Sequence, residues 1–80
     1  MSEVAYARID VSDEFMRDSG AWRPMVRKEL RAKLAELGTV QRVSRVLIDP
    51  LERHGITEFG PGPAPGSHLI VMVARLAGRP

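Results

Sequence analysis

Three residues whose types could perform acid–base or metal chemistry lie close together in this sequence, around one turn. The sequence holds two histidines and no cysteine, which excludes a cysteine nucleophile, a thiolate metal site and a disulfide framework. Glu52, His54 and Glu58 are close enough in sequence to approach one another around that turn. However, neither His54 nor His68 belongs to a nucleophile or metal-binding motif. We therefore interpret the turn as a solvated surface and expect no catalytic, metal or cofactor site.

The stretch GPGPAPG, residues 60–66, follows the turn. A glycine-rich loop binds phosphate through backbone N–H groups, and prolines lack them, so this stretch is not an anion cradle. Prolines would also interrupt the hydrogen bonding of a helix or a central strand. The sequence therefore predicts an exposed loop here.

Length and charge limit the stability and the partners of the protein. A chain of 80 residues buries only roughly 60% of the surface that its unfolded form exposes, so we expect a partner or self-association to add stability. The formal net charge is +2, from 12 basic and 10 acidic residues, which indicates a mixed surface.

Membrane insertion is not expected. The first residues lack the basic and apolar regions of a signal peptide. The apolar run at 69–74 is far shorter than the ~20 residues of a membrane span. We expect a protein that is made in the cytoplasm and does not enter a membrane.

A strand and a short helix are expected at the start of the chain. Apolar and polar side chains alternate over 4–11, which predicts a strand or an extended arm. Ser12 precedes two acidic residues, a pattern typical of an N-cap, and the short helix that it begins would end at Gly20.

An amphipathic helix is predicted over about 22–37, with Gly38 as its C-terminal stop. Apolar residues recur on one face of it, namely Val26, Leu30, Leu34 and Leu37. Its other faces carry basic residues, including Arg27, Lys28 and Arg31. These three form a possible second surface, which would bind an acidic protein or phosphates.

The second half of the chain predicts a small antiparallel sheet. Residues 39–48 are rich in β-branched side chains and end before Pro50, which favours a strand. A helical stripe also fits this stretch through Val40, Val43 and Leu47. Residues 56–59 predict a brief strand, while 68–76 fits either a strand or a helix. The fold class that we expect is α+β, as a single domain over 1–80.

A winged-helix DNA-binding protein is one alternative. Residues 34–47 could form a helix-turn-helix that points Arg42 and Arg45 toward a DNA groove, with 60–67 as the wing. Pro50 would then fall inside the recognition helix, and the wing would carry no basic residue for phosphates. These two features count against the alternative.

Three short motifs support another interpretation: VLIDP at 46–50, ITEFG at 56–60 and PAPGSH at 63–68. In this order they resemble the small neck and tail-completion proteins of long-tailed bacteriophages. The resemblance spans most of 7–77 and is specific at 56–65. Two departures are the shortness of the chain and the proline that directly follows ITEFG.

The resemblance implies a non-enzymatic virion protein of α+β fold that joins head and tail or completes the tail. Such a subunit would form a ring with copies of itself and bind other head or tail proteins. It would need no cofactor, and DNA would at most pass by or bind nonspecifically.

The residues that we predict as the interface lie in and after the ITEFG motif. They are Glu58, Phe59, Gly60, Pro61, Pro63 and Pro65. Glu58 offers a charge and Phe59 an aromatic ring, and aromatic side chains are enriched in interface cores. Loop residues restricted by proline lose less entropy when they dock.

Overall fold

The computed structural model describes residues 2–50, 52–53 and 56–77. The elements in chain order are β1 (Ser2–Ser12), α1 (Asp13–Asp18), α2 (Trp22–Ala35), β2 (Val40–Ile48), β3 (Glu52–Arg53), β4 (Ile56–Thr57), β5 (Gly60–Pro61) and β6 (Ser67–Ala77). The α+β class, the N-terminal strand and the antiparallel sheet are confirmed. Around the predicted turn, Glu52–Arg53 form β3, and His54 lies outside the described residues.

The last strand of the chain occupies the middle of the main sheet. The strand order is β1-β6-β2, and β6 pairs antiparallel with both neighbours, so β1 and β2 run in the same direction. A strand flanked on both sides and covered on both faces needs a continuous apolar sequence. The run over 69–74 provides it, and each of these residues is buried. Residues 68–76, for which the sequence left both a strand and a helix open, therefore form a strand.

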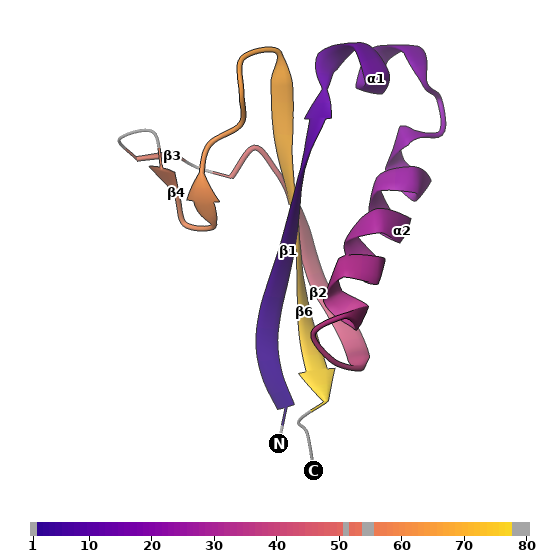
Figure 1. Ribbon diagram of the computed structural model, residues 1–80, viewed down its shortest axis with the longest axis vertical. Helices are drawn as coiled ribbons and strands as arrows, with labels where there is room; N and C mark the ends of the chain where they lie inside the picture. The colour runs from indigo at the N-terminus through magenta and orange to yellow at the C-terminus, as the bar shows by residue number, and fades with distance from the viewer. Residues whose placement is uncertain (1, 51, 54–55, 78–80) are drawn as a thin grey trace.

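Helix α2 covers one face of the sheet (Figure 1). Its apolar stripe packs on alternate residues of β6 and on β1, with Val26, Leu30, Leu34, Ile70, Met72, Ala74, Ala7 and Val11 buried in one cluster. Leu37 was placed on this stripe, and that prediction is wrong. The helix ends at Ala35, so the side chain of Leu37 leaves the apolar face and is 48% exposed. Gly38 follows without the positive φ of a left-handed cap.

The short helix α1 begins as expected. The side-chain oxygen of Ser12 accepts a hydrogen bond from the Phe15 backbone N–H at 3.1 Å, which satisfies one of the free donors of the first turn. The helix therefore turns the chain sharply at the end of β1 and leads it toward α2 (Figure 1).

The irregular pairing of β2 explains part of the helical pattern in its sequence. Its pairing with β6 shifts between Val40 and Arg42 and again between Val43 and Arg45. Each shift inserts an extra residue, as a β-bulge does. Val40 and Val43, three positions apart, therefore return to the face that meets α2, whereas Leu47 lies on the opposite face. The winged-helix alternative needed a recognition helix in this stretch, and the strand removes its basis.

The opposite face of the sheet is only partly covered. The strands β3, β4 and β5 form a second antiparallel sheet, the small sheet, which lies on the other side of the main sheet from α2 (Figure 1). Phe59, in the turn between β4 and β5, packs there against Leu69, Val71 and Val73. The molecule is thin as a result, with principal extents of 42 × 32 × 17 Å.

Candidate functional site

The predicted interface residues form the turn of the small sheet and the loop after it. Glu58, Pro61 and Pro65 are exposed, whereas Gly60 and Pro63 are half-buried. Phe59 is only 8% exposed, so its ring belongs to the interior of this chain. The exposed members lie on either side of Phe59, and the ring fixes the turn to the sheet.

Phe59 bridges β6 and β1. Besides its contacts with β6, its ring meets the ring of Tyr6 edge-on, with 5.0 Å between centroids and 62° between planes. Edge-to-face pairs of this kind are favourable because the positive edge of one ring meets the negative face of the other. The aromatic residue of the ITEFG motif is thus held by a tyrosine from the start of the chain.

Thr57 shapes the turn itself. Its hydroxyl oxygen accepts a hydrogen bond from the Phe59 backbone N–H at 3.0 Å, and the hydroxyl donates to the Gly60 carbonyl at 2.9 Å. Thr57 is buried, and both functions of its hydroxyl are satisfied. The motif therefore needs a hydroxyl at this position.

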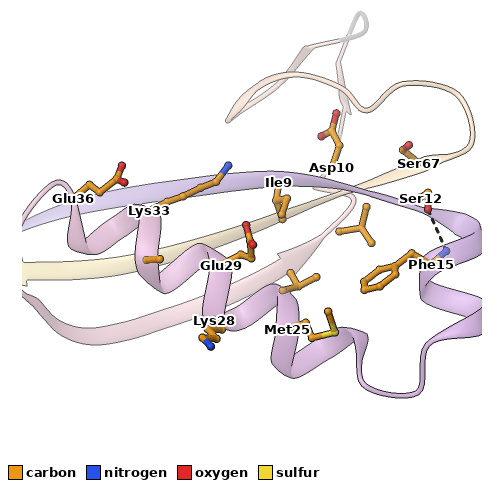
Figure 2. A pocket seen from close by; sticks show the side chains of 13 residues that line it. Ile9, Asp10, Ser12, Phe15, Met25, Lys28, Glu29, Lys33, Glu36 and Ser67 are labelled. Atoms are coloured by element: carbon orange, nitrogen blue, oxygen red, sulfur yellow. Dashed lines mark hydrogen bonds between the residues drawn. The ribbon is translucent and has the colours of Figure 1, made fainter.

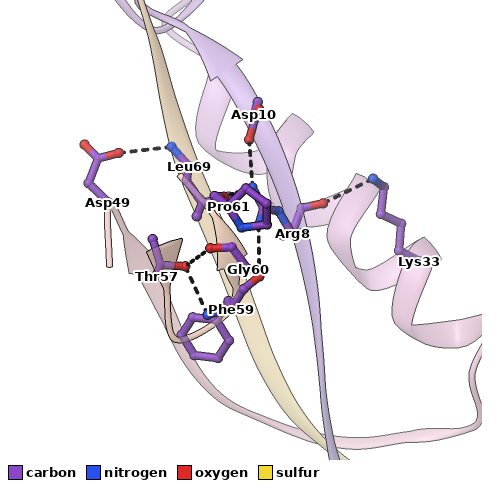
Figure 3. A network of polar contacts seen from close by, with 9 residues as sticks. All are labelled: Arg8, Asp10, Lys33, Asp49, Thr57, Phe59, Gly60, Pro61 and Leu69. Carbon is purple, nitrogen blue, oxygen red and sulfur yellow. Dashed lines mark hydrogen bonds and ion pairs between the residues drawn. The ribbon is translucent and has the colours of Figure 1, made fainter. Parts of the chain in front are cut away.

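Arg8 joins the turn to the main sheet (Figure 3). Its guanidinium donates from Nη1 to the Phe59 carbonyl at 2.9 Å and from Nη2 to the Pro61 carbonyl at 2.6 Å. Asp10 holds the same guanidinium at 3.6 Å. A charged donor makes stronger hydrogen bonds than a neutral one, so one side chain of β1 fixes both ends of the Gly60 segment.

Gly60 is required by this arrangement for two reasons. Its φ is +105°, a conformation that L-residues with side chains rarely adopt. A Cβ at this position would also lie 2.8 Å from Nη1 of Arg8. The glycine of the ITEFG motif therefore lets Arg8 approach the backbone.

A second polar cluster lies at the far end of the main sheet. His68, in β6, places Nδ1 at 2.5 Å from Asp49 Oδ2 and Nε2 at 2.8 Å from Asp13 Oδ1. Asp49, which has a φ of +49°, also accepts a hydrogen bond from the Leu69 backbone N–H at 3.0 Å. The imidazole thus connects the start of α1 with the end of β2.

This geometry favours the charged imidazolium. The hydrogen bond that the His68 ring donates to the Asp49 carboxylate, supported by the negative charges of Asp49 and Asp13, raises the pKa of His68 above its usual value, although partial burial opposes the shift. Both ring nitrogens can donate only when the ring is protonated. The three side chains therefore link α1, β2 and β6. Among the described residues, no group of His, Asp or Glu side chains is arranged so that it could hold a metal ion.

Two grooves flank α2. The larger, of about 1030 Å³, lies between α2, α1 and the end of β1, with Phe15 and Met25 near α1 and charged side chains of α2 along its rim (Figure 2). The smaller, of about 320 Å³, lies between α2 and β2 and includes Trp22, Val46 and Ile48.

The basic residues of the second predicted surface do not form one patch. Lys28 lines the larger groove and Arg27 the smaller one, so the two point toward different sides of α2. Arg31 is exposed, one turn after Arg27. An extended acidic partner would have to reach across the helix to contact them all.

Sequence reasoning missed the residues that position the candidate site. Arg8, Tyr6, Asp49 and His68 were not selected, and they contact residues 19 to 55 positions away. A signal existed only for Arg8 and Tyr6, which share one face of the alternating strand. The side chain of Glu52 and all of His54 lie outside the part of the chain that can be described.

Comparisons with protein-family models, with curated proteins and with solved structures found no match to this chain. The resemblance to phage neck proteins therefore stays a prediction based on the motifs at 46–68. In the described part of the chain, no helix is long and apolar enough to cross a membrane.

Proposed function

We propose that this protein is a non-enzymatic structural subunit that forms a ring with copies of itself and joins head and tail, or completes the tail, in a phage virion assembled in the host cytoplasm. Other virion head and tail proteins are its remaining partners. The proposal combines the resemblance at 46–68 with one observation, the two unpaired edges of the main sheet.

Within the described residues, β1 and β2 each pair with β6 alone, so the outer edge of both strands is open. An open edge presents unpaired backbone N–H and C=O groups to another chain. Large apolar side chains are exposed along both strands: Val4 and Tyr6 in β1, and Val46 and Ile48 in β2. These edges supply both hydrogen bonds and apolar area for association.

The direction of the strands favours a ring. Because β1 and β2 run in the same direction, the β1 edge of one copy can pair with the β2 edge of the next as a parallel ladder. Two different surfaces then meet at each contact, and such contacts repeat around a closed ring when the rotation closes. The right-handed twist of β-sheets turns each copy relative to the last.

The turn of the small sheet is a second contact for virion neighbours. Glu58 and Pro61 are exposed there, while Thr57, Phe59 and Arg8 hold the backbone in place. A contact that is already rigid loses little entropy on binding.

The test is the solution mass of the purified protein over a range of concentrations, with electron microscopy of the largest species. We expect a closed ring of several subunits. A monomer at all concentrations, or an open filament, contradicts the proposal.

A pair of matched variants locates the contact. Ile48 and Leu37 are equally exposed, at 48% each, but only Ile48 lies on a sheet edge. A lysine on an edge strand opposes pairing. Ile48→Lys should therefore weaken association at least tenfold, whereas Leu37→Lys should leave it unchanged. Equal effects of the two variants would assign association to general hydrophobicity.

A further inference from the structure

We propose that the uncovered half of the sheet face opposite α2 binds single-stranded nucleic acid, with the guanidinium groups of Arg42 and Arg45 holding phosphates. We call this half the open face; it consists of Val4, Tyr6, Arg42, Arg45, Val73 and Arg75, of which only Val73 is buried. The inference goes beyond the proposed assembly and does not depend on it, because Arg42 and Arg45 are not among the apolar edge residues assigned to the ring contact.

The register defines which side chains share this face. Val73 packs toward Phe59, whereas Met72 and Ala74 pack toward α2. Side chains alternate along a strand, so Arg75 lies on the same face as Val73. Residues directly opposite on paired strands also share a face. In β2, Arg42 pairs with Arg75 and Arg45 pairs with Val73.

The β1 side of the open face is aromatic and apolar. Val4 pairs with Arg75, and Tyr6 pairs with Val73. Val4 is 62% exposed and Tyr6 46% exposed, so the small sheet leaves both accessible. The Tyr6 ring contacts Phe59, which places it at the border between the covered half and the open face.

Charge is segregated on the open face. Of its six residues, Arg42, Arg45 and Arg75 are basic and exposed, and none is acidic. Arg75 also makes an interaction within the chain, so the inference rests on Arg42 and Arg45.

The second bulge of β2 creates this grouping. Without it, three residues of separation would place Arg42 and Arg45 on opposite faces of the strand. The extra residue between Val43 and Arg45 returns the second arginine to the face of the first. The bulges thus have a consequence for charge as well as for packing.

The chemistry of the face favours a nucleic-acid strand over an acidic peptide. A planar guanidinium binds a phosphate with two parallel hydrogen bonds. The half-exposed Tyr6 ring offers a surface on which a base can stack, as aromatic side chains do in single-strand binding proteins. An acidic peptide would use the arginines and leave the ring unused. Three strands span about 10 Å, which suits one strand and its bases.

The basic residues of α2 provide a matched control. Arg27 and Arg31 are exposed arginines on the other side of the main sheet, and Glu29 lies between them in the helix. Replacing both by glutamine changes the net charge by the same amount as Arg42→Gln with Arg45→Gln. General electrostatic attraction predicts equal effects of the two double variants.

The experiment is fluorescence anisotropy of a labelled oligothymidylate of about 15 nucleotides, within the site sizes of known single-strand binding folds, titrated at several salt concentrations. Each phosphate contact contributes about 0.7 to the slope of log affinity against log salt for a single strand. The Arg42→Gln, Arg45→Gln variant should therefore lower the slope by about 1.4 and weaken binding at least tenfold at low salt. Arg42→Lys with Arg45→Lys should restore most of the slope.

Each outcome decides the inference. Loss of binding in the open-face variant with binding retained in the α2 variant supports it, provided that thermal melting shows both variants folded. Equal losses, or no binding of the wild type at low salt, overturn it. Tighter binding of a duplex of the same length, or of a polyglutamate peptide, also overturns the choice of a single strand.

Discussion

The two faces of β6 are held by different physical means. Toward α2, Ile70, Met72 and Ala74 meet a helix that buries three of its own apolar residues. On the opposite face, Leu69, Val71 and Val73 are covered by the Phe59 ring and by a turn whose backbone Arg8 holds. One face is stabilised by many apolar contacts, and the other by a few specific ones. A region with few contacts opens at lower free energy than the core.

Leu30→Ala should have the largest effect on stability. Leu30 is fully buried in the cluster between α2 and the sheet, and buried Leu→Ala changes leave a cavity that costs about 4 kcal/mol. Leu37→Ala is the control, because an exposed leucine should cost less than about 1 kcal/mol. Urea unfolding followed by circular dichroism measures both. Similar losses at the two positions would mean that the stripe does continue to Leu37.

Phe59→Ala should cost about 3 kcal/mol, the lower end for a buried aromatic residue, because its ring packs in a small cluster and not in the larger core under α2. The part of the molecule that Phe59→Ala loosens is more informative than the total loss of stability. Amide exchange should accelerate at Thr57 and Gly60 while β6 stays protected, because the small sheet can detach alone. Uniform acceleration across β6 would show that the two faces unfold together.

Gly60→Ala should cost about 2 kcal/mol, from roughly 1 kcal/mol of left-handed strain and a similar loss from a displaced Arg8 hydrogen bond. Gly66→Ala is the matched control. Its φ of +80° carries the same kind of strain, but a Cβ there meets no atom within 4 Å, so about 1 kcal/mol is expected.

A double-mutant cycle tests whether Arg8 explains the difference. In an Arg8→Met background, Gly60→Ala should cost no more than Gly66→Ala, since the displaced hydrogen bond is already absent. Additive costs of Arg8→Met and Gly60→Ala would assign the loss to backbone strain alone. Chemical denaturation of the four proteins measures the coupling.

The smallest effect on stability is its dependence on pH through the ion pairs of His68 with Asp13 and Asp49. The folded state raises the pKa of His68, so the folded protein binds the proton more tightly than the unfolded chain does. The resulting stability is fully present below the usual histidine pKa of about 6.5 and is lost as pH rises through the raised value. Melting temperature measured from pH 5 to 9 should fall across this window. His68→Gln should remove that part of the dependence, and an unchanged profile would show that other groups cause it.

Local elements were predictable because their signals are local. The Ser12 cap and the stripe at 26–34 each follow from residues within a few positions of one another. The loop predicted over 60–66 holds only in part, because Gly60–Pro61 forms β5 and Gly62 and Pro63 are half-buried. The prediction that Leu37 belongs to the apolar stripe was wrong because the spacing of apolar residues does not show where a helix ends. Residues 40–48 were ambiguous because a bulged strand and a helix both return apolar residues to one face after three positions.

The candidate site was predictable only in part. Glu58 and Pro61, which the sequence predicted as interface residues, lie exposed, whereas Phe59 is buried. The sequence did not show that Arg8 binds this turn, because 51 positions separate it from Phe59. Pairing over such a distance depends on which strand lies next to which.

The sequence by itself determined the α+β class, the capped helix, the amphipathic helix and the loop, because propensity and periodicity act over short distances. Only the tertiary structure decided that β6 lies between β1 and β2, which brings Arg8 to Phe59 and His68 to both Asp13 and Asp49. It also decided that Arg42 and Arg45 share one face with Tyr6. The physical reason is that strand order and register are set by the joint burial of both faces of β6, a property of the whole chain and not of any one segment.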